Sequence, residues 1–368
     1  MKTIMQAFTG GINSKKSAPD ILKRLIEMQK KTASDTLLIG WNTKVNYKEI
    51  VKYFHKIKCE VYLWLPVFSE YGDFAVPAKD YQGNHHKNAI SGAEDDFVFS
   101  CPSLIHNRDI GLIFYNRFFA SAGFDGVFLD KIRFSSFGNG FHSGMGCFCL
   151  FCNRFYQQQG VDLSALNQMM QEENKNFLVP SSLTDMKYHF ENEVIESFYT
   201  ARADLITKSV KIVIEKFKEK DLKIGLDVYA PPFAYLFGQD IKALAKEADF
   251  IKPMLYRVTD APAGIPYESY HLKKELLANG CAIGNKLEEL WGVKDLSDLD
   301  SLKVQLDLLK QISCPVYPGV EVNKVAICKT NLEYVKENLT IFEDHDIPGW
   351  VMSWSVLEKT VYPSKERR

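Results

Sequence analysis

The chain has 368 residues, of which 46% are hydrophobic and 25% are charged, which is the balance of an ordinary globular protein with ample material for a core. This composition excludes a disordered or fibrous chain. The 45 Lys and Arg residues against 46 Asp and Glu residues leave a net charge of -1, without basic clusters longer than short pairs. The sequence therefore predicts neither a nucleic-acid partner nor a membrane partner.

The first eight residues contain one basic residue and no long apolar stretch, so a signal peptide is not expected. No run approaches the roughly 18 apolar residues of a membrane span. We therefore expect a soluble, cytoplasmic protein. In that reducing compartment, the eight cysteines should be free thiols or metal ligands rather than disulfides.

Eight short apolar runs, rich in β-branched and aromatic residues, recur along the chain and predict strands. They span residues 4–8, 37–41, 61–65, 126–129, 224–229, 250–256, 316–322 and 350–354. Helical patterns lie between them, at residues 18–31, 47–58, 190–218, 239–248, 302–312 and 331–345. Strands that alternate with helices pair in parallel through right-handed crossovers. Eight such repeats predict an α/β fold, the closed (β/α)8 or TIM barrel.

Two connections are too long for a single helix, at about residues 67–123 and 135–189. Connections of this length usually carry function or extra structure. They follow the third and fourth predicted strands, so both should lie on the face where barrel active sites are built. The chain shows no linker composition, and we expect residues 1–368 to form one barrel domain with these two insertions.

Three cysteines, Cys147, Cys149 and Cys152, fall within six positions of the second insertion. The C-x-x-C spacing lets two thiolates reach one zinc ion, and Cys147 adds a third ligand nearby. A structural zinc needs four ligands, and both Cys101 and His142 are candidates for the fourth. Buried free thiols and a redox pair are the alternatives.

The order Cys101-Pro102, followed 46 residues later by the C-x-C-x-x-C run, resembles the zinc cluster of the glycoside hydrolase family 42 β-galactosidases. In that family, four cysteines hold a structural zinc that joins two barrel loops beside the active site. The resemblance implies that Cys101, Cys147, Cys149 and Cys152 are ligands of a structural Zn²⁺. No organic cofactor is expected.

A carboxylate, Asp130, follows the fourth predicted strand, with Arg133 three residues further on. Residues 125–134 are similar to a D-G-x-x-x-D-x-x-R-[FY] motif of uncharacterised glycoside-hydrolase-like barrels, which implies a catalytic Asp130. Family 42 enzymes carry Asn-Glu where this chain has Leu129-Asp130. A salt bridge from Asp130 to Arg133 or Lys131 is the structural alternative.

A second acid, Glu321, ends the seventh predicted strand, where barrel glycosidases of the larger clan that includes family 42 carry their nucleophile. Cleavage of a glycoside needs one neutral and one charged carboxyl group. The resemblance implies Glu321 as nucleophile or base and Asp130 as proton donor, or the reverse. Asp227, near the end of the fifth strand, is a third candidate for the proton donor, or it anchors Arg133 or Lys252.

Aromatic and polar residues near the predicted strand ends suit a sugar substrate, although core packing is an alternative for each aromatic. The candidate substrate-binding residues are Trp41, Asn42, Trp64, Arg133, Tyr256, Arg257, Asn323 and Trp354.

The sequence thus predicts a glycosidase that acts on an oligosaccharide or glycoside with two carboxylates. A non-catalytic carbohydrate-binding barrel is one alternative. A barrel lyase or isomerase is another, with Lys252 as a base or Schiff-base residue. Homo-oligomerisation stays open.

Overall fold

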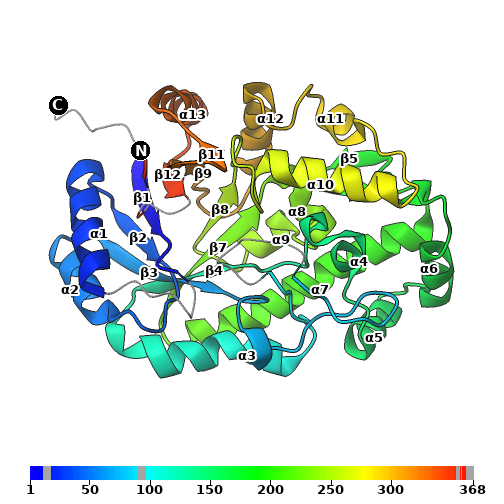
Figure 1. The fold of residues 1–368 in the computed structure, drawn as a ribbon, viewed down its shortest axis with the longest axis horizontal. Coiled ribbons are helices and arrows are strands. Elements are labelled where there is room, and N and C mark those ends of the chain that lie inside the picture. Colours follow the sequence, from blue (N-terminus) through cyan, green and yellow to red (C-terminus); the bar gives the residue numbers. More distant parts are fainter. Residues whose placement is uncertain (11–17, 89–96, 354–356, 358, 362–368) are drawn as a thin grey trace.

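The computed structural model describes residues 1–10, 18–88, 97–353, 357 and 359–361. Its centre is a closed barrel with the strand order β1-β12-β9-β8-β7-β4-β3-β2, and every neighbouring pair is parallel (Figure 1). The strands are β1 (Lys2–Ala7), β2 (Thr36–Ile39), β3 (Glu60–Pro66), β4 (Gly126–Asp130), β7 (Lys223–Tyr229), β8 (Phe250–Met254), β9 (Gly319–Glu321) and β12 (Gly349–Ser353). The predicted fold class is confirmed.

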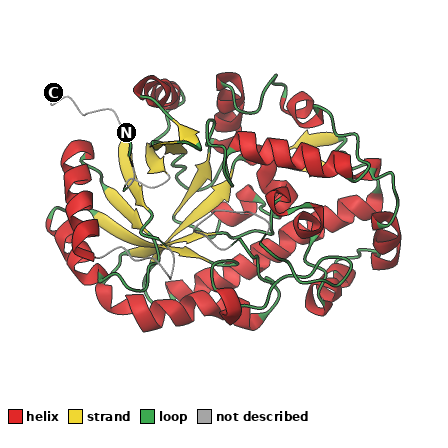
Figure 2. Cartoon of the chain, in the orientation of Figure 1, coloured by secondary structure: helices red, strands yellow, loops and turns green. Residues whose placement is uncertain are grey.

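Helices surround the barrel, and some of them form a separate group beside it (Figure 2). They are α1 (Ala18–Thr32), α2 (Tyr47–Lys56), α3 (Ile105–Phe114), α4 (Phe141–Met145), α5 (Leu150–Gln158), α6 (Leu163–Met170), α7 (Glu193–Lys218), α8 (Pro231–Ala234), α9 (Ile241–Ala245), α10 (Ile265–Ala278), α11 (Lys286–Trp291), α12 (Leu299–Leu309) and α13 (Leu332–Asp344). In Figure 1, α4, α5 and α6 lie on the opposite side of the molecule from α1 and α2.

Helix α2 shows how local sequence produces these elements. The side chain of Asn46 accepts a hydrogen bond from the main-chain N–H of Lys48 and so caps the helix. Tyr47, Ile50 and Phe54, spaced at helical intervals, are buried. The helix therefore packs one apolar face on the barrel and leaves the other to solvent.

The two long connections are built differently. The β3–β4 connection contains α3 and irregular loops, whereas the β4–β7 connection contains α4 to α7 and a hairpin of β5 (Ser182–Thr184) and β6 (Lys187–His189). A second hairpin, β10 (Lys324–Val325) with β11 (Cys328–Lys329), follows β9. None of the helices in the described part of the chain has the length and apolar character needed to cross a lipid bilayer.

Aromatic rings fill the part of the barrel interior that lies toward the amino ends of the strands, and two glycines make room for these rings. A Cβ atom on Gly126 would lie 2.4 Å from the ring of Tyr62, and one on Gly225 would lie 2.2 Å from Phe250. Phe128 stacks on Phe250 with ring centroids 6.0 Å apart. Since side chains alternate along a strand, the inward positions above these rings are Asp130, Asp227 and Lys252.

Candidate active site

Three ionisable side chains lie side by side on β4, β7 and β8: Asp130 ends β4, and Asp227 and Lys252 each lie two residues before the carboxyl end of their strand. Asp227 pairs in register with Lys252, and Asp130 follows Leu129, whose register partner is Leu226. Lys252 Nζ lies 3.0 Å from Asp227 Oδ2, and the two residues are 0% and 2% exposed. The barrel thus brings ionisable groups together in a buried cluster near its mouth.

Asp130 is held by donors on both oxygens. The indole Nε1 of Trp64, on β3, donates to Oδ2 at 2.9 Å, and the main-chain N–H of Lys131 donates to Oδ1. An ionised carboxylate only accepts hydrogen bonds, so this arrangement suits a charged Asp130.

Asp227 is in the opposite situation. Burial raises the pKa of its carboxyl to about 8, and the nearby charge of Asp130 adds to this increase. Lys252 and Gln6 oppose the shift but are outweighed. Asp227 therefore keeps its proton at neutral pH while it lies beside a charged partner, as a general acid must.

Glu321 is fully buried and its oxygens are occupied by protein donors. The main-chain N–H of Val258 and the hydroxyl of Thr259 donate to Oε1 at 2.8 and 3.3 Å, and the hydroxyl of Tyr334 donates to Oε2 at 2.6 Å. Burial raises the pKa of Glu321. These contacts tie β9 to the loop after β8 and to α13.

Tyr256 lies next to Lys252 and within electrostatic reach of the three acids. Its hydroxyl accepts a hydrogen bond from Lys252 Nζ. Burial raises the pKa of Tyr256, and the charges of Asp227, Glu321 and Asp130 contribute. All three predicted catalytic acids thus lie within electrostatic reach of one phenol group.

An aromatic group stands next to Asp130. The rings of Trp41 and Trp64 meet edge to face with centroids 4.9 Å apart, and Phe8 lies 5.3 and 5.9 Å from them. The Nε1 atom of Trp41 is buried without a hydrogen-bond partner among the described residues. Trp354, the third predicted tryptophan, lies outside the described residues.

The other predicted substrate-binding residues contact the protein itself. Asn42 donates to the carbonyl of Thr9, and the main-chain carbonyl of Asn323 accepts from Thr330. Their assignment to a substrate stays a prediction.

The two arginines are likewise engaged. The guanidinium of Arg133 lies 4.5 Å from the ring centre of Phe99 and 4.0 Å from that of Tyr229. Arg257 donates to Asn338 at 3.2 Å and to the carbonyl of Ser297 at 2.9 Å. A substrate role for them also stays a prediction.

Sequence reasoning missed one residue and one ion pair of this region. Gln6, which is 1% exposed, contacts Asp227, and it is visible in the sequence as a polar residue inside an apolar run. Glu70 and Lys131 form a buried ion pair, each with a left-handed backbone conformation at φ 76° and 53°. No local pattern announces that pair, because its members are 61 residues apart.

The four predicted cysteine ligands meet. Cys101 Sγ lies 3.3 Å from Cys149 Sγ and 3.5 Å from Cys152 Sγ, and all four sulfurs, including that of Cys147, lie within 4.8 Å of one another. A tetrahedral zinc with Zn–S bonds of about 2.3 Å needs sulfurs roughly 3.8 Å apart. The donor set and its spacing therefore fit a zinc ion, and His142 is not part of the cluster.

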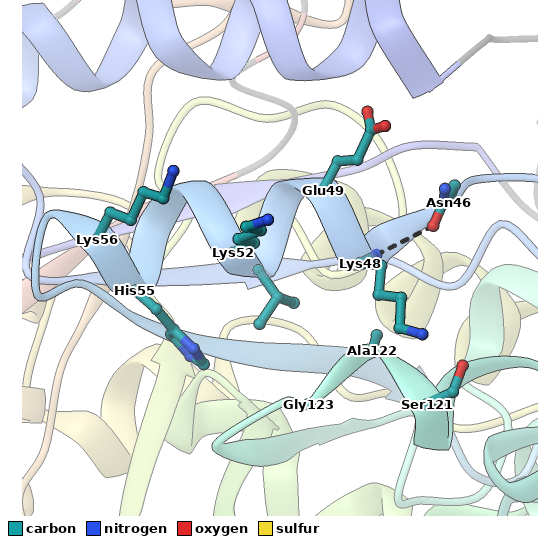
Figure 3. A pocket seen from close by; sticks show the side chains of 10 residues that line it. Asn46, Lys48, Glu49, Lys52, His55, Lys56, Ser121, Ala122 and Gly123 are labelled. Atoms are coloured by element: carbon teal, nitrogen blue, oxygen red, sulfur yellow. Dashed lines mark hydrogen bonds between the residues drawn. The ribbon is translucent and has the colours of Figure 1, made fainter.

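A pocket of about 830 Å³ lies elsewhere, between α2 and the turn η3 (Ala120–Ala122) (Figure 3). Lys48, Lys52, His55 and Lys56 line it, with Glu49 as its acid. It holds no pair of carboxylates, so we place the candidate active site at the barrel mouth.

Fold and cluster together define a (β/α)8 barrel whose ionisable groups gather at the carboxyl ends of its strands. The glycoside hydrolase domain of PgaB (BpsB) from Bordetella bronchiseptica is similar, with a TM-score of 0.58 over 97% of this chain and 95% of that chain, at 11% identity. At this identity, the similarity establishes a shared barrel fold.

Two further solved structures align at lower scores. They are the spore cortex-lytic enzyme SleL from Bacillus megaterium (TM-score 0.47, 8% identity, 98% of this chain and 71% of that chain) and the glycoside hydrolase domain of PelA from Pseudomonas aeruginosa (0.43, 11%, 98% and 97%). No protein-family model matches the sequence, and no curated protein matches it.

Proposed function

We propose that the chain is a glycoside hydrolase in which Asp227 protonates the leaving oxygen and Asp130 is the charged partner. The observation that carries this proposal is the burial of Asp227, which is 2% exposed, on the strand next to that of Asp130; this burial raises the pKa of Asp227 to about 8. Glycoside cleavage needs one neutral and one charged carboxyl group, and neighbouring acids with separated pKa values supply them. The fold shared with the PgaB glycoside hydrolase domain supports the proposed class of enzyme.

The charged partner, Asp130, either attacks the anomeric carbon or activates a water molecule. The hydrogen bond from Trp64 Nε1 orients its carboxylate for either role. Glu321 is the alternative partner for Asp227, although its three protein donors favour a role in anchoring the loop after β8.

The substrate we propose is a neutral oligosaccharide or glycoside. Phe8, which is only partly buried and packs on Trp41 and Trp64, offers apolar ring surface for the C–H face of a sugar.

The test is turnover of a panel of aryl glycosides by Asp227→Asn and Asp130→Asn. Each variant should lose about 10²- to 10⁴-fold in kcat, because each removes one half of the acid–base pair. In the wild type, kcat/KM should fall as the pH rises through about 8, where Asp227 loses its proton. Asp300→Asn, at an exposed position on α12, is the matched control and should keep full activity.

Undiminished turnover in both variants would eliminate this assignment. Loss in Asp227→Asn and Glu321→Gln, with full turnover in Asp130→Asn, would transfer the role of partner to Glu321. Saturable oligosaccharide binding without turnover would favour the carbohydrate-binding barrel. Borohydride trapping of a substrate on Lys252 would favour the lyase or isomerase.

We also propose that Cys101, Cys147, Cys149 and Cys152 hold a structural Zn²⁺, supported by their mutual distances. Such an ion would cross-link the two long connections and supply no chemistry to the bond cleavage. Elemental analysis of protein purified without chelator should find about one equivalent, and less than about half an equivalent would refute the site.

A further inference from the structure

A fully buried arginine adjoins the cysteine cluster. Arg202, on α7, is 0% exposed, and its guanidinium donates to the carbonyl oxygens of Gly144 at 2.9 Å, Gly146 at 3.1 Å and Met145. These three residues directly precede Cys147. The hydrogen bonds of Arg202 thus hold the main-chain segment that leads into Cys147.

Within the described part of the chain, no carboxylate forms an ion pair with Arg202. Its hydrogen bonds there all go to carbonyl oxygens, and its Nε has no partner among the described residues. The ring of Phe134, 4.5 Å away, gives only weak compensation. A buried cation in this state is unfavourable unless negative charge lies nearby.

The cysteine cluster is a source of that negative charge. Cys147 and Cys152 are among the groups that act electrostatically on Arg202, together with Tyr156 and Tyr199. When four thiols bind a divalent ion, they release four protons and form a centre with net charge -2. A dianion in a buried site is itself unfavourable without a cation beside it.

We propose that Arg202 is the counter-cation of a metal–tetrathiolate centre formed by Cys101, Cys147, Cys149 and Cys152. The inference rests on the proposed zinc site. It adds Arg202, which lies on α7 and belongs to neither of the two segments that carry the cysteines. Arg202 also packs on Phe134, which lies four residues after Asp130. It therefore links the metal centre to the segment that follows the candidate catalytic strand.

The test compares Zn²⁺ affinity in wild type, Arg202→Met and Arg202→Lys, measured by competition with a chromophoric chelator. Loss of the charge in Arg202→Met should weaken Zn²⁺ binding by roughly 10- to 100-fold, the range typical for outer-shell partners of a metal. Arg202→Lys keeps the charge and should stay within about tenfold of wild type. Val213→Ala, a buried truncation further along α7, is the control for general destabilisation and should bind Zn²⁺ like wild type.

The outcomes separate the two proposals. If wild-type protein contains no metal and titration with a thiol reagent shows disulfides, the zinc site itself is wrong. If wild type binds Zn²⁺ and a folded Arg202→Met binds it equally well, the counter-cation role is wrong.

The lysine variant decides the question if Arg202→Met does not fold. A folded Arg202→Lys that loses far more than tenfold in affinity shows that the carbonyl contacts, and not the charge, support the metal. Tetrahedral absorption bands after Co²⁺ substitution give a readout of the centre that does not depend on catalytic activity.

Discussion

The pKa of Asp227 is set by opposing effects of its surroundings. Burial and the charge of Asp130 favour the neutral acid, while Lys252, at 3.0 Å, favours the carboxylate. Burial and the charge of Asp130 outweigh Lys252, so the pKa of Asp227 is raised. Without Lys252, that pKa would be higher still. This balance decides the pH range in which a proton donor is present.

Replacement of Lys252 by Met removes the positive charge that lowers the pKa of Asp227. The pKa of Asp227 should rise further, and the alkaline limb of the kcat/KM profile should move upward by about one pH unit or more. The variant should still fold, because a neutral Asp227 leaves no uncompensated charge behind.

The measurement is the pH dependence of kcat/KM, with the exposed Lys303→Met as the control. An alkaline limb that stays in place, or moves to lower pH, would contradict the proposed role of Asp227 as the acid.

At this scale, some candidate residues could be found from the sequence and others could not. Asp130 stands out because it ends an apolar strand run, Asp227 because it interrupts one, and the cysteines because of their spacing. The hydrogen bonds that occupy Glu321 come from Val258, Thr259 and Tyr334, which are distant in sequence, so no local pattern could reveal them.

At the scale of elements, the β3–β4 connection is fastened to the end of β4. Glu70, at the start of the connection, pairs with Lys131, whose main-chain N–H also binds Asp130. The side chains are only 5% and 7% exposed, and Lys131 Nζ lies 4.3 Å from the ring centre of Phe97. Two left-handed residues are maintained here, which is unfavourable without such support.

Glu70→Gln removes the carboxylate from this buried pair. We expect the free energy of unfolding to fall by about 3–5 kcal/mol, the usual effect of breaking a buried ion pair from one side. Urea unfolding measures it. Asp300→Asn, which breaks the exposed pair with Lys303, should change stability by less than about 1 kcal/mol, and equal effects in both variants would contradict the argument.

Strand positions were predictable because barrel strands are buried on both sides and form continuous apolar runs. The seventh predicted strand, 316–322, is shorter in the structure, where β9 covers only Gly319–Glu321 and Val316 forms an isolated bridge with Ile251. The helix predicted at 239–248 is confined to Ile241–Ala245, because Asp240 caps its start. The small hairpins β5–β6 and β10–β11 escaped prediction, since two or three residues carry no period.

At the scale of the molecule, the cysteine cluster joins regions that the chain separates widely. Cys101 comes from the β3–β4 connection, and the other three cysteines come from the β4–β7 connection. Helix α3 of the first connection packs on α7 of the second, and the main-chain N–H of Phe148 donates to the carbonyl of Lys79. A metal bound by the four cysteines would add a stronger cross-link to these contacts.

Removal of the metal by a strong chelator should therefore loosen these connections and spare the rest. Hydrogen exchange should accelerate in residues 97–104 and 141–158 but not in β1, β2 or α2, and Tm should fall by about 5 °C or more. Uniform acceleration, or no change with demonstrated loss of zinc, would contradict a local structural role.

The packing of Tyr62, Phe128 and Phe250 beneath the acids has a final consequence for the route by which a ligand reaches the acids. Since Gly126 and Gly225 let these rings fill the interior, no passage leads to the opposite end of the barrel. The acids are therefore approached from the face formed by the carboxyl ends of the strands, which is the face where barrel enzymes build their active sites.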